Sequence, residues 1–124
     1  MNKANGKKII IVDDETDIVI VLTEFLKKEG FDVTSCSNGE DAIKQVASED
    51  FDLMLLDISM PGMSGIEVLR DLHRSKPALA VIMITAFKDA EKVVECFRLG
   101  AFDCIFKPFD LKYLRKAILA KLLC

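Results

Sequence analysis

Short apolar runs alternate along this chain with segments whose apolar residues recur every three or four positions. The apolar runs occupy residues 8–12, 31–36, 51–56, 80–84 and 104–106. The first, third and fourth are nearly all Ile, Val, Leu and Met, and continuous runs of this kind predict strands that are buried on both faces. Strands that alternate with helices predict an α/β fold, in which helices cover both faces of a parallel sheet.

The segments between the runs have the spacing of amphipathic helices. The first helix is expected to end near Gly30, a residue type that commonly terminates helices. Its predicted apolar face consists of Ile18, Val21, Leu22 and Phe25. The fourth helix is predicted over residues 89–99, with an apolar face of Ala90, Val93, Val94 and Phe97. The fifth is predicted to begin near Asp110, with an apolar face of Leu111, Leu114, Ile118 and Leu122.

The second and third helices begin with the spacing of a capping box, in which the first side chain caps the helix. Ser37 and Glu40 have this spacing before the second helix, which is predicted over residues 38–48. Ser64 and Glu67 repeat it before the third, which is predicted to end near Arg74. The sequence therefore predicts five strand–helix units with right-handed crossovers. A five-stranded sheet of this kind commonly has the strand order 2-1-3-4-5.

Composition supports one domain without a membrane segment. The chain has 124 residues, of which 51% are hydrophobic and 30% are charged, and no repeat or linker interrupts it. We therefore expect a single domain over residues 1–124, with a core over about 7–122. The net charge of −3 argues against direct nucleic-acid binding. No apolar run reaches the roughly 18 residues of a membrane span, and none resembles a signal peptide, so we expect a cytoplasmic protein.

The cysteines show no pattern of a metal site or a redox pair. They lack CxxC spacing and histidine partners, so we expect reduced thiols packed as small apolar groups. The four are Cys36, Cys96, Cys104 and Cys124.

Polar side chains follow four of the five predicted strands. Asp13 and Asp14 follow the first strand, Asp57 the third, Thr85 the fourth and Lys107 the fifth. In an open parallel sheet the ligand crevice lies beyond the carboxyl ends of the strands, where the strand order reverses. With the order 2-1-3-4-5 this point lies between strands one and three, so we expect the three aspartates to meet there.

Three converging carboxylates repel one another unless a cation lies between them. Oxygen ligands without histidine or thiolate favour Mg²⁺ over zinc. The ammonium of Lys107 and the hydroxyl of Thr85 suit a negatively charged phosphoryl group, and the carboxylate of Asp57 can act as its nucleophile. Each residue alone has an ordinary interpretation as a helix cap, a β-branched filler or a loop residue. Their combination at one rim predicts a Mg²⁺-dependent phosphoryl-transfer site.

The chain resembles the receiver domains of response regulators in two-component signalling. The stretches that carry the resemblance are IIIVDDE (9–15), LMLLDISMPGMSGIE (53–67), IMITA (82–86) and FKPF (106–109). It implies the flavodoxin-like doubly wound fold of chemotaxis receivers. It also implies that Asp57 is the phosphoacceptor, that Asp14 binds Mg²⁺ directly, that Asp13 does so mainly through water, and that the backbone carbonyl of Ser59 is a further ligand.

The resemblance also implies roles at strands four and five. Thr85 would bond the phosphoryl oxygen, and Lys107 would pair with the phosphoryl group and precede a cis bond to Pro108. Ser59 and Phe87 occupy positions expected to tune a slow self-dephosphorylation. Beyond its own phosphoryl transfer, the domain would act as a signalling module and not as an enzyme.

The implied partners are proteins. The donor would be a phosphohistidine on a sensor histidine kinase or a histidine phosphotransfer protein. The output domain or partner would recognise the surface of helix four, strand five and helix five, and phosphorylation would also favour a homodimer. Apolar residues beside the main helix faces are either ordinary surface residues or docking positions, for the kinase on helix one and for a dimer or output partner on helix five. They are Val19, Ile20, Leu119 and Leu123.

Cys104 departs from the family pattern. Receiver domains usually carry Tyr or Phe three residues before the lysine, and the position of that ring reports the switch. Here the residue is Cys104, so the pocket is expected to be emptier or to be filled by Phe102. A redox role for Cys104 is a further alternative.

Three other functions are compatible with parts of this pattern. A Mg²⁺-dependent phosphohydrolase would carry a second acid two residues after the nucleophile, where this chain has Ser59. A flavin-binding protein of the same topology would need a Ser/Thr/Gly phosphate loop after strand one, where this chain has Asp13, Asp14 and Glu15. A receiver-like module that never takes phosphate is the third, and Cys104 keeps it open.

Overall fold

The computed structural model describes residues 6–86 and 88–123, and over these ranges the predicted α/β fold is confirmed. Five parallel strands pair in the predicted order β2-β1-β3-β4-β5. Their bounds are β1 (Lys8–Val12), β2 (Asp32–Cys36), β3 (Leu53–Asp57), β4 (Ala80–Thr85) and β5 (Asp103–Phe106). Phe87 and Cys124 lie outside the described residues, so the expectations for these two positions stay predictions.

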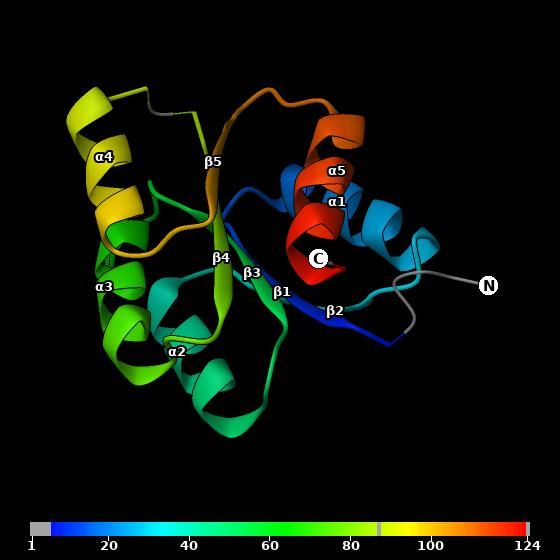
Figure 1. Ribbon diagram of the computed structural model, residues 1–124, viewed down its shortest axis with the longest axis horizontal. Coiled ribbons are helices and arrows are strands. Elements are labelled where there is room, and N and C mark those ends of the chain that lie inside the picture. Colours follow the sequence, from blue (N-terminus) through cyan, green and yellow to red (C-terminus); the bar gives the residue numbers. More distant parts are fainter. Residues whose placement is uncertain (1–5, 87, 124) are drawn as a thin grey trace.

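Helices cover the sheet on both faces, so the domain has three layers (Figure 1). One face is covered by α1 (Thr16–Lys28) and α5 (Leu111–Leu122). The other is covered by α2 (Gly39–Ser48), α3 (Gly65–Ser75) and α4 (Ala90–Arg98). Each face has its own apolar core, and β1, β3 and β4 contribute to both because their side chains alternate between the faces.

The capping prediction was right for α3 and wrong for α2. Ser64 caps α3, and its hydroxyl accepts a hydrogen bond from the backbone N–H of Glu67 at 3.3 Å. At α2 the cap is Asn38 and not Ser37, because the Asn38 side chain accepts from the N–H of Asp41 at 2.8 Å. Asn caps a helix as well as Ser does, so two adjacent capping residues left the start ambiguous by one position.

The predicted apolar faces of two helices were partly wrong. On α1 the buried residues are Leu22 and Leu26, whereas Val21 is half exposed. On α4 the buried residue is Cys96, whereas Val94 and Phe97 are each 47% exposed. The face that a helix buries is set by the layer beneath it, and periodicity alone does not fix it when apolar residues lie on two sides. The face predicted for α5 is confirmed at Leu114 and Ile118.

Within the described ranges, no helix has the length and apolar character that crossing a membrane requires.

Candidate functional site

Three aspartates converge at the carboxyl ends of β1 and β3. Asp57 is the last residue of β3, and Asp13 and Asp14 directly follow β1. β1 and β3 are neighbours, and Val12 pairs with Leu56, so the next residue on each strand is one of the aspartates. Asp13 and Asp57 are buried, Asp14 is exposed, and one carboxylate oxygen from each lies within 4.8 Å of the others. The structure therefore brings the three predicted acids together.

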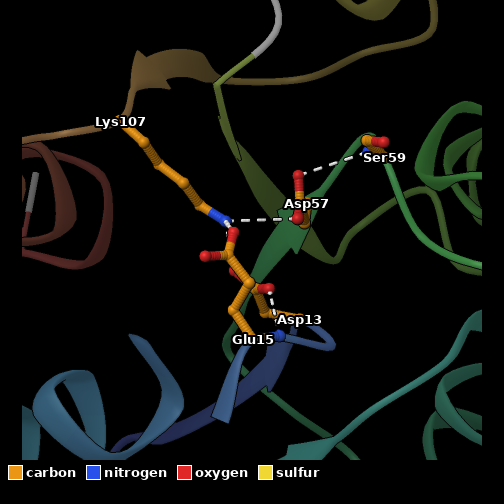
Figure 2. Close-up of polar contacts among 5 residues, drawn as sticks. All are labelled: Asp13, Glu15, Asp57, Ser59 and Lys107. Carbon is orange, nitrogen blue, oxygen red and sulfur yellow. Dashed lines mark hydrogen bonds and ion pairs between the residues drawn. The ribbon is translucent and has the colours of Figure 1, made fainter. Parts of the chain in front are cut away.

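Lys107 reaches this group from beyond the end of β5 (Figure 2). Its ammonium nitrogen lies 2.8 Å from a carboxylate oxygen of Asp13, 2.7 Å from one of Glu15 and 3.2 Å from one of Asp57. The side chain is 8% exposed, and the backbone N–H donates to the carbonyl of Thr85 at 2.8 Å. The Lys107–Pro108 peptide bond is cis, as expected. The lysine is thus placed over the acids by both its main chain and its side chain.

Backbone donors hold the two buried carboxylates in place. The N–H of Glu15 donates to the second oxygen of Asp13 at 2.9 Å, and the N–H of Ser59 donates to the second oxygen of Asp57 at 3.2 Å. Each of these aspartates therefore uses one oxygen for the loop that follows its own strand and the other for Lys107. Figure 2 shows this arrangement.

Burial and the nearby charge of Asp13 raise the pKa of Asp57 to about 6. The ammonium of Lys107 and the N–H of Ser59 oppose this shift without cancelling it. Burial lowers the pKa of Lys107, but its hydrogen bonds to Asp13 and Glu15 outweigh burial, and the net pKa is raised. Lys107 is therefore a cation at neutral pH. The surroundings of Asp57 disfavour the ionised form of its carboxyl group.

The donor set fits a hard divalent cation. Asp13, Asp14 and Asp57 offer carboxylate oxygens only, and the raised pKa of Asp57 shows that one ammonium does not offset burial and mutual repulsion. Mg²⁺ prefers such oxygens together with water and phosphate. These residues are suited to hold that ion.

Thr85 ends β4 and is completely buried. It is tied to the site through its carbonyl, which accepts the N–H of Lys107, and β4 lies between β3 and β5. Ser59 is an exposed residue of the loop after β3, and its N–H already orients Asp57. Both residues thus lie beside the acids on neighbouring elements.

Two residues near the acids were not singled out from the sequence. Glu15 contacts Lys107, and its only sequence signal was its place directly after the aspartate pair. Gly65 begins α3 and donates its N–H to the carbonyl of Ile58 at 2.8 Å. An ideal Cβ at Gly65 would lie 2.0 Å from the carbonyl oxygen of Asp57, so only glycine fits this approach.

Cys104 lies on β5 and packs against the core beneath α2, α3 and α4. Phe102 does not take the place of the missing ring, because it is 41% exposed and its ring lies 5.2 Å from the Lys121 ammonium. Burial raises the pKa of the thiols of Cys36, Cys96 and Cys104, that of Cys96 to about 11. These three cysteines are free thiols, as expected, and their raised pKa values disfavour the reactive thiolate.

The raised pKa of Asp57 gives a prediction for the metal-free protein. Between about pH 4 and pH 6 the folded chain binds a proton at Asp57 that the unfolded chain has lost, so stability falls as the pH rises through this range. By about pH 7 the loss is nearly complete, because Asp57 is then ionised in both the folded and the unfolded chain. Urea unfolding of the wild type and of Asp57→Asn, measured from pH 4 to pH 7, checks this. The variant should gain stability relative to the wild type as the pH rises, and a constant difference would contradict the prediction.

Comparisons with known proteins agree with this geometry. A family model described as the response regulator receiver domain matches residues 9–119. The sporulation initiation phosphotransferase F of Bacillus subtilis is 39% identical over 113 residues, which cover 91% of each chain. Other relatives are longer, and the chain spans 44% and 45% of two transcriptional regulatory proteins from the same bacterium.

Solved structures show the same likeness. A CheY-like response regulator receiver domain protein from Methanospirillum hungatei JF-1 superposes with a TM-score of 0.92 at 33% identity, covering 95% of this chain and 94% of that one. A response regulator protein from Thermotoga maritima, in complex with Mg²⁺ and beryllofluoride, gives a TM-score of 0.86 at 34% identity, covering 94% and 99%.

Proposed function

Since this chain belongs to the family of response regulator receiver domains, which are phosphorylated on an aspartate with Mg²⁺ in two-component signalling, we propose that Asp57 is its phosphoacceptor. The observation that carries the assignment is the reach of Lys107 from β5 to Asp57 at 3.2 Å and to Asp13 at 2.8 Å. It places one fixed cation beside a buried carboxylate at the end of the central strand.

The ion would be held by residues of the two strands at the reversal point. Asp14 and Asp57 would bind it directly, Asp13 mainly through water, and the backbone carbonyl of Ser59 would complete the protein ligands. When bound, Mg²⁺ supplies positive charge that neutralises the phosphoryl oxygens. The clustering of carboxylate oxygens within 4.8 Å supports this assignment.

The chain's own residues would perform the transfer. A carboxylate oxygen of Asp57 attacks phosphorus in line, the bond from phosphorus to the donor's histidine nitrogen breaks, and that nitrogen keeps the electron pair. Lys107 offsets the charge on the phosphoryl group, and the hydroxyl of Thr85 bonds one of its oxygens. Slow self-dephosphorylation, with Ser59 beside the acceptor, would return the domain to its resting state.

Receiver domains take phosphoryl groups from kinases and link to output domains. For this chain the donor would be a sensor histidine kinase or a histidine phosphotransfer protein, and the exposed apolar residues Ile20 and Val21 on α1 support docking there. The surface of α4, β5 and α5 would serve an output domain, a partner or a homodimer, and Val94 and Phe97 are exposed on it. The acidic charge supports a role without direct nucleic-acid contact.

A titration with Mg²⁺ and beryllofluoride, followed by NMR, tests this function. Beryllofluoride mimics a phosphoryl group on a carboxylate, so in the presence of Mg²⁺ it should shift the amide signals of Thr85, Lys107, α4 and β5. Asp57→Asn should not respond to beryllofluoride. Asp50→Asn is the matched control, because its side chain is fully exposed at the other end of β3, and it should respond like the wild type. A wild-type protein that ignores both reagents would refute the proposal.

A further inference from the structure

All three N–H donors of the Lys107 ammonium are matched by carboxylate acceptors. A lysine ammonium carries three N–H groups, and carboxylates of Asp13, Glu15 and Asp57 lie at hydrogen-bond distance from it. A phosphoryl oxygen that binds Lys107 must therefore displace one of these three. How readily the site accepts the phosphoryl group therefore depends on which carboxylate is displaced from Lys107.

The carboxylate of Glu15 differs from the other two in its surroundings. Its side chain is 57% exposed, whereas Asp13 and Asp57 are buried and are also held by backbone donors. Glu15 occupies the N-cap position of α1, yet its side chain makes no capping hydrogen bond. It is turned toward Lys107 instead, at 2.7 Å, which is the shortest of the three contacts. The helix does not account for this orientation, whereas the lysine does.

We propose that Glu15 is a positioning residue that holds Lys107 in the unphosphorylated state and competes with phosphoryl oxygens for its ammonium. This inference rests on the proposed function of the same site. Lys107 cannot leave Asp13 and Asp57 without leaving two buried charges unpaired, unless a divalent cation takes its place between them. Once that cation is bound, Glu15 is the remaining competitor, and its exposed carboxylate can turn into water when the phosphoryl group arrives.

The contact can be removed without removing the charge. Glu15→Asp keeps the carboxylate but withdraws it by one methylene group, and Glu15→Gln keeps the length but removes the charge. Asp17→Asn is the matched control, because Asp17 is an exposed acid in the first turn of α1, two residues further along the chain. At saturating Mg²⁺, the beryllofluoride concentration for half saturation should fall about threefold in both Glu15 variants, as for the loss of one partly exposed ion pair. It should stay unchanged in Asp17→Asn.

A second measurement reports on Lys107 without any phosphoryl analogue. The ¹⁵N NMR signal of its ammonium gives the rate at which these protons exchange with water. This rate should rise in Glu15→Asp, because one of the three acceptors is withdrawn, and in Glu15→Gln, because a neutral amide oxygen accepts more weakly than a carboxylate. It should match the wild type in Asp17→Asn.

The outcomes separate this inference from the function beneath it. If Glu15→Asp keeps the wild-type half-saturation and exchange rate, the inference is overturned while the function stands. If Glu15→Gln alone changes, the effect is one of overall charge, and the inference is again overturned. If the wild type does not bind beryllofluoride with Mg²⁺, the proposed function itself fails.

Discussion

Replacing Asp57 with Ala is expected to abolish the incorporation of base-labile phosphate from a small phosphodonor such as acetyl phosphate in the presence of Mg²⁺. Asp57 is the carboxylate at the end of β3, beside Lys107, and alanine provides no oxygen to attack phosphorus. Lys107 keeps its contacts with Asp13 and Glu15, so its charge stays paired in the variant. The measurement is the radiolabel that each protein takes from the phosphodonor, before and after alkaline treatment. The label on Asp57→Ala should be no higher than the background of protein that has received no donor.

Asp50→Asn provides the control, since it removes a fully exposed acid on the turn before β3 and should label like the wild type. Persistent labelling of Asp57→Ala would show that another side chain accepts the phosphoryl group. Asp13 and Asp14 would then be the first candidates, because their oxygens lie in the same cluster.

Replacing Gly65 with Ala is expected to lower the free energy of unfolding by about 3 kcal/mol or more. The added Cβ would lie 2.0 Å from the carbonyl oxygen of Asp57 and 2.8 Å from the Cα of Ile58. Both are backbone atoms, so no rotation of a side chain relieves the overlap, and the start of α3 must move away from β3. Because this loop also carries Ser59, which orients Asp57, Mg²⁺ affinity should fall together with stability.

Gly39→Ala is a graded comparison for urea unfolding. Its Cβ would meet a methyl group of Val68 at 2.6 Å, which belongs to a side chain and not to the backbone, so the loss should be smaller, at about 1 to 2 kcal/mol. Equal losses in the two variants would show that the backbone around Asp57 tolerates a side chain at Gly65.

The sequence was sufficient for the sheet and for the predicted acids and lysine, because both follow from strong constraints. Continuous apolar runs fix buried parallel strands, and parallel strands deliver Asp13, Asp57 and Lys107 to one rim whatever the details of packing. The roles assigned to these residues remain predictions that the experiments above address.

The sequence was insufficient where packing or geometry decides. The face that α4 buries contains Cys96, whereas Val94 and Phe97 lie on an exposed face. Both faces have helical spacing, so the periodicity of the sequence does not show which one is buried. The contact between Glu15 and Lys107 joins residues that lie 92 positions apart in the sequence. The clash at Gly65 arises because the start of α3 lies close to the backbone of Asp57. Contacts of this kind appear only in three dimensions.

The weak anchorage of α4 has a consequence for motion. Of its nine residues, Cys96 is the one that is fully buried, whereas α3 buries five. Lifting α4 from the sheet therefore exposes little new apolar surface, and its local opening should cost less free energy than that of α3. Its contact with α3 through Arg70 and Glu95 is an exposed ion pair, which solvent can replace at little cost. A helix held in this way can change its position while the sheet beneath it and α3 beside it stay folded.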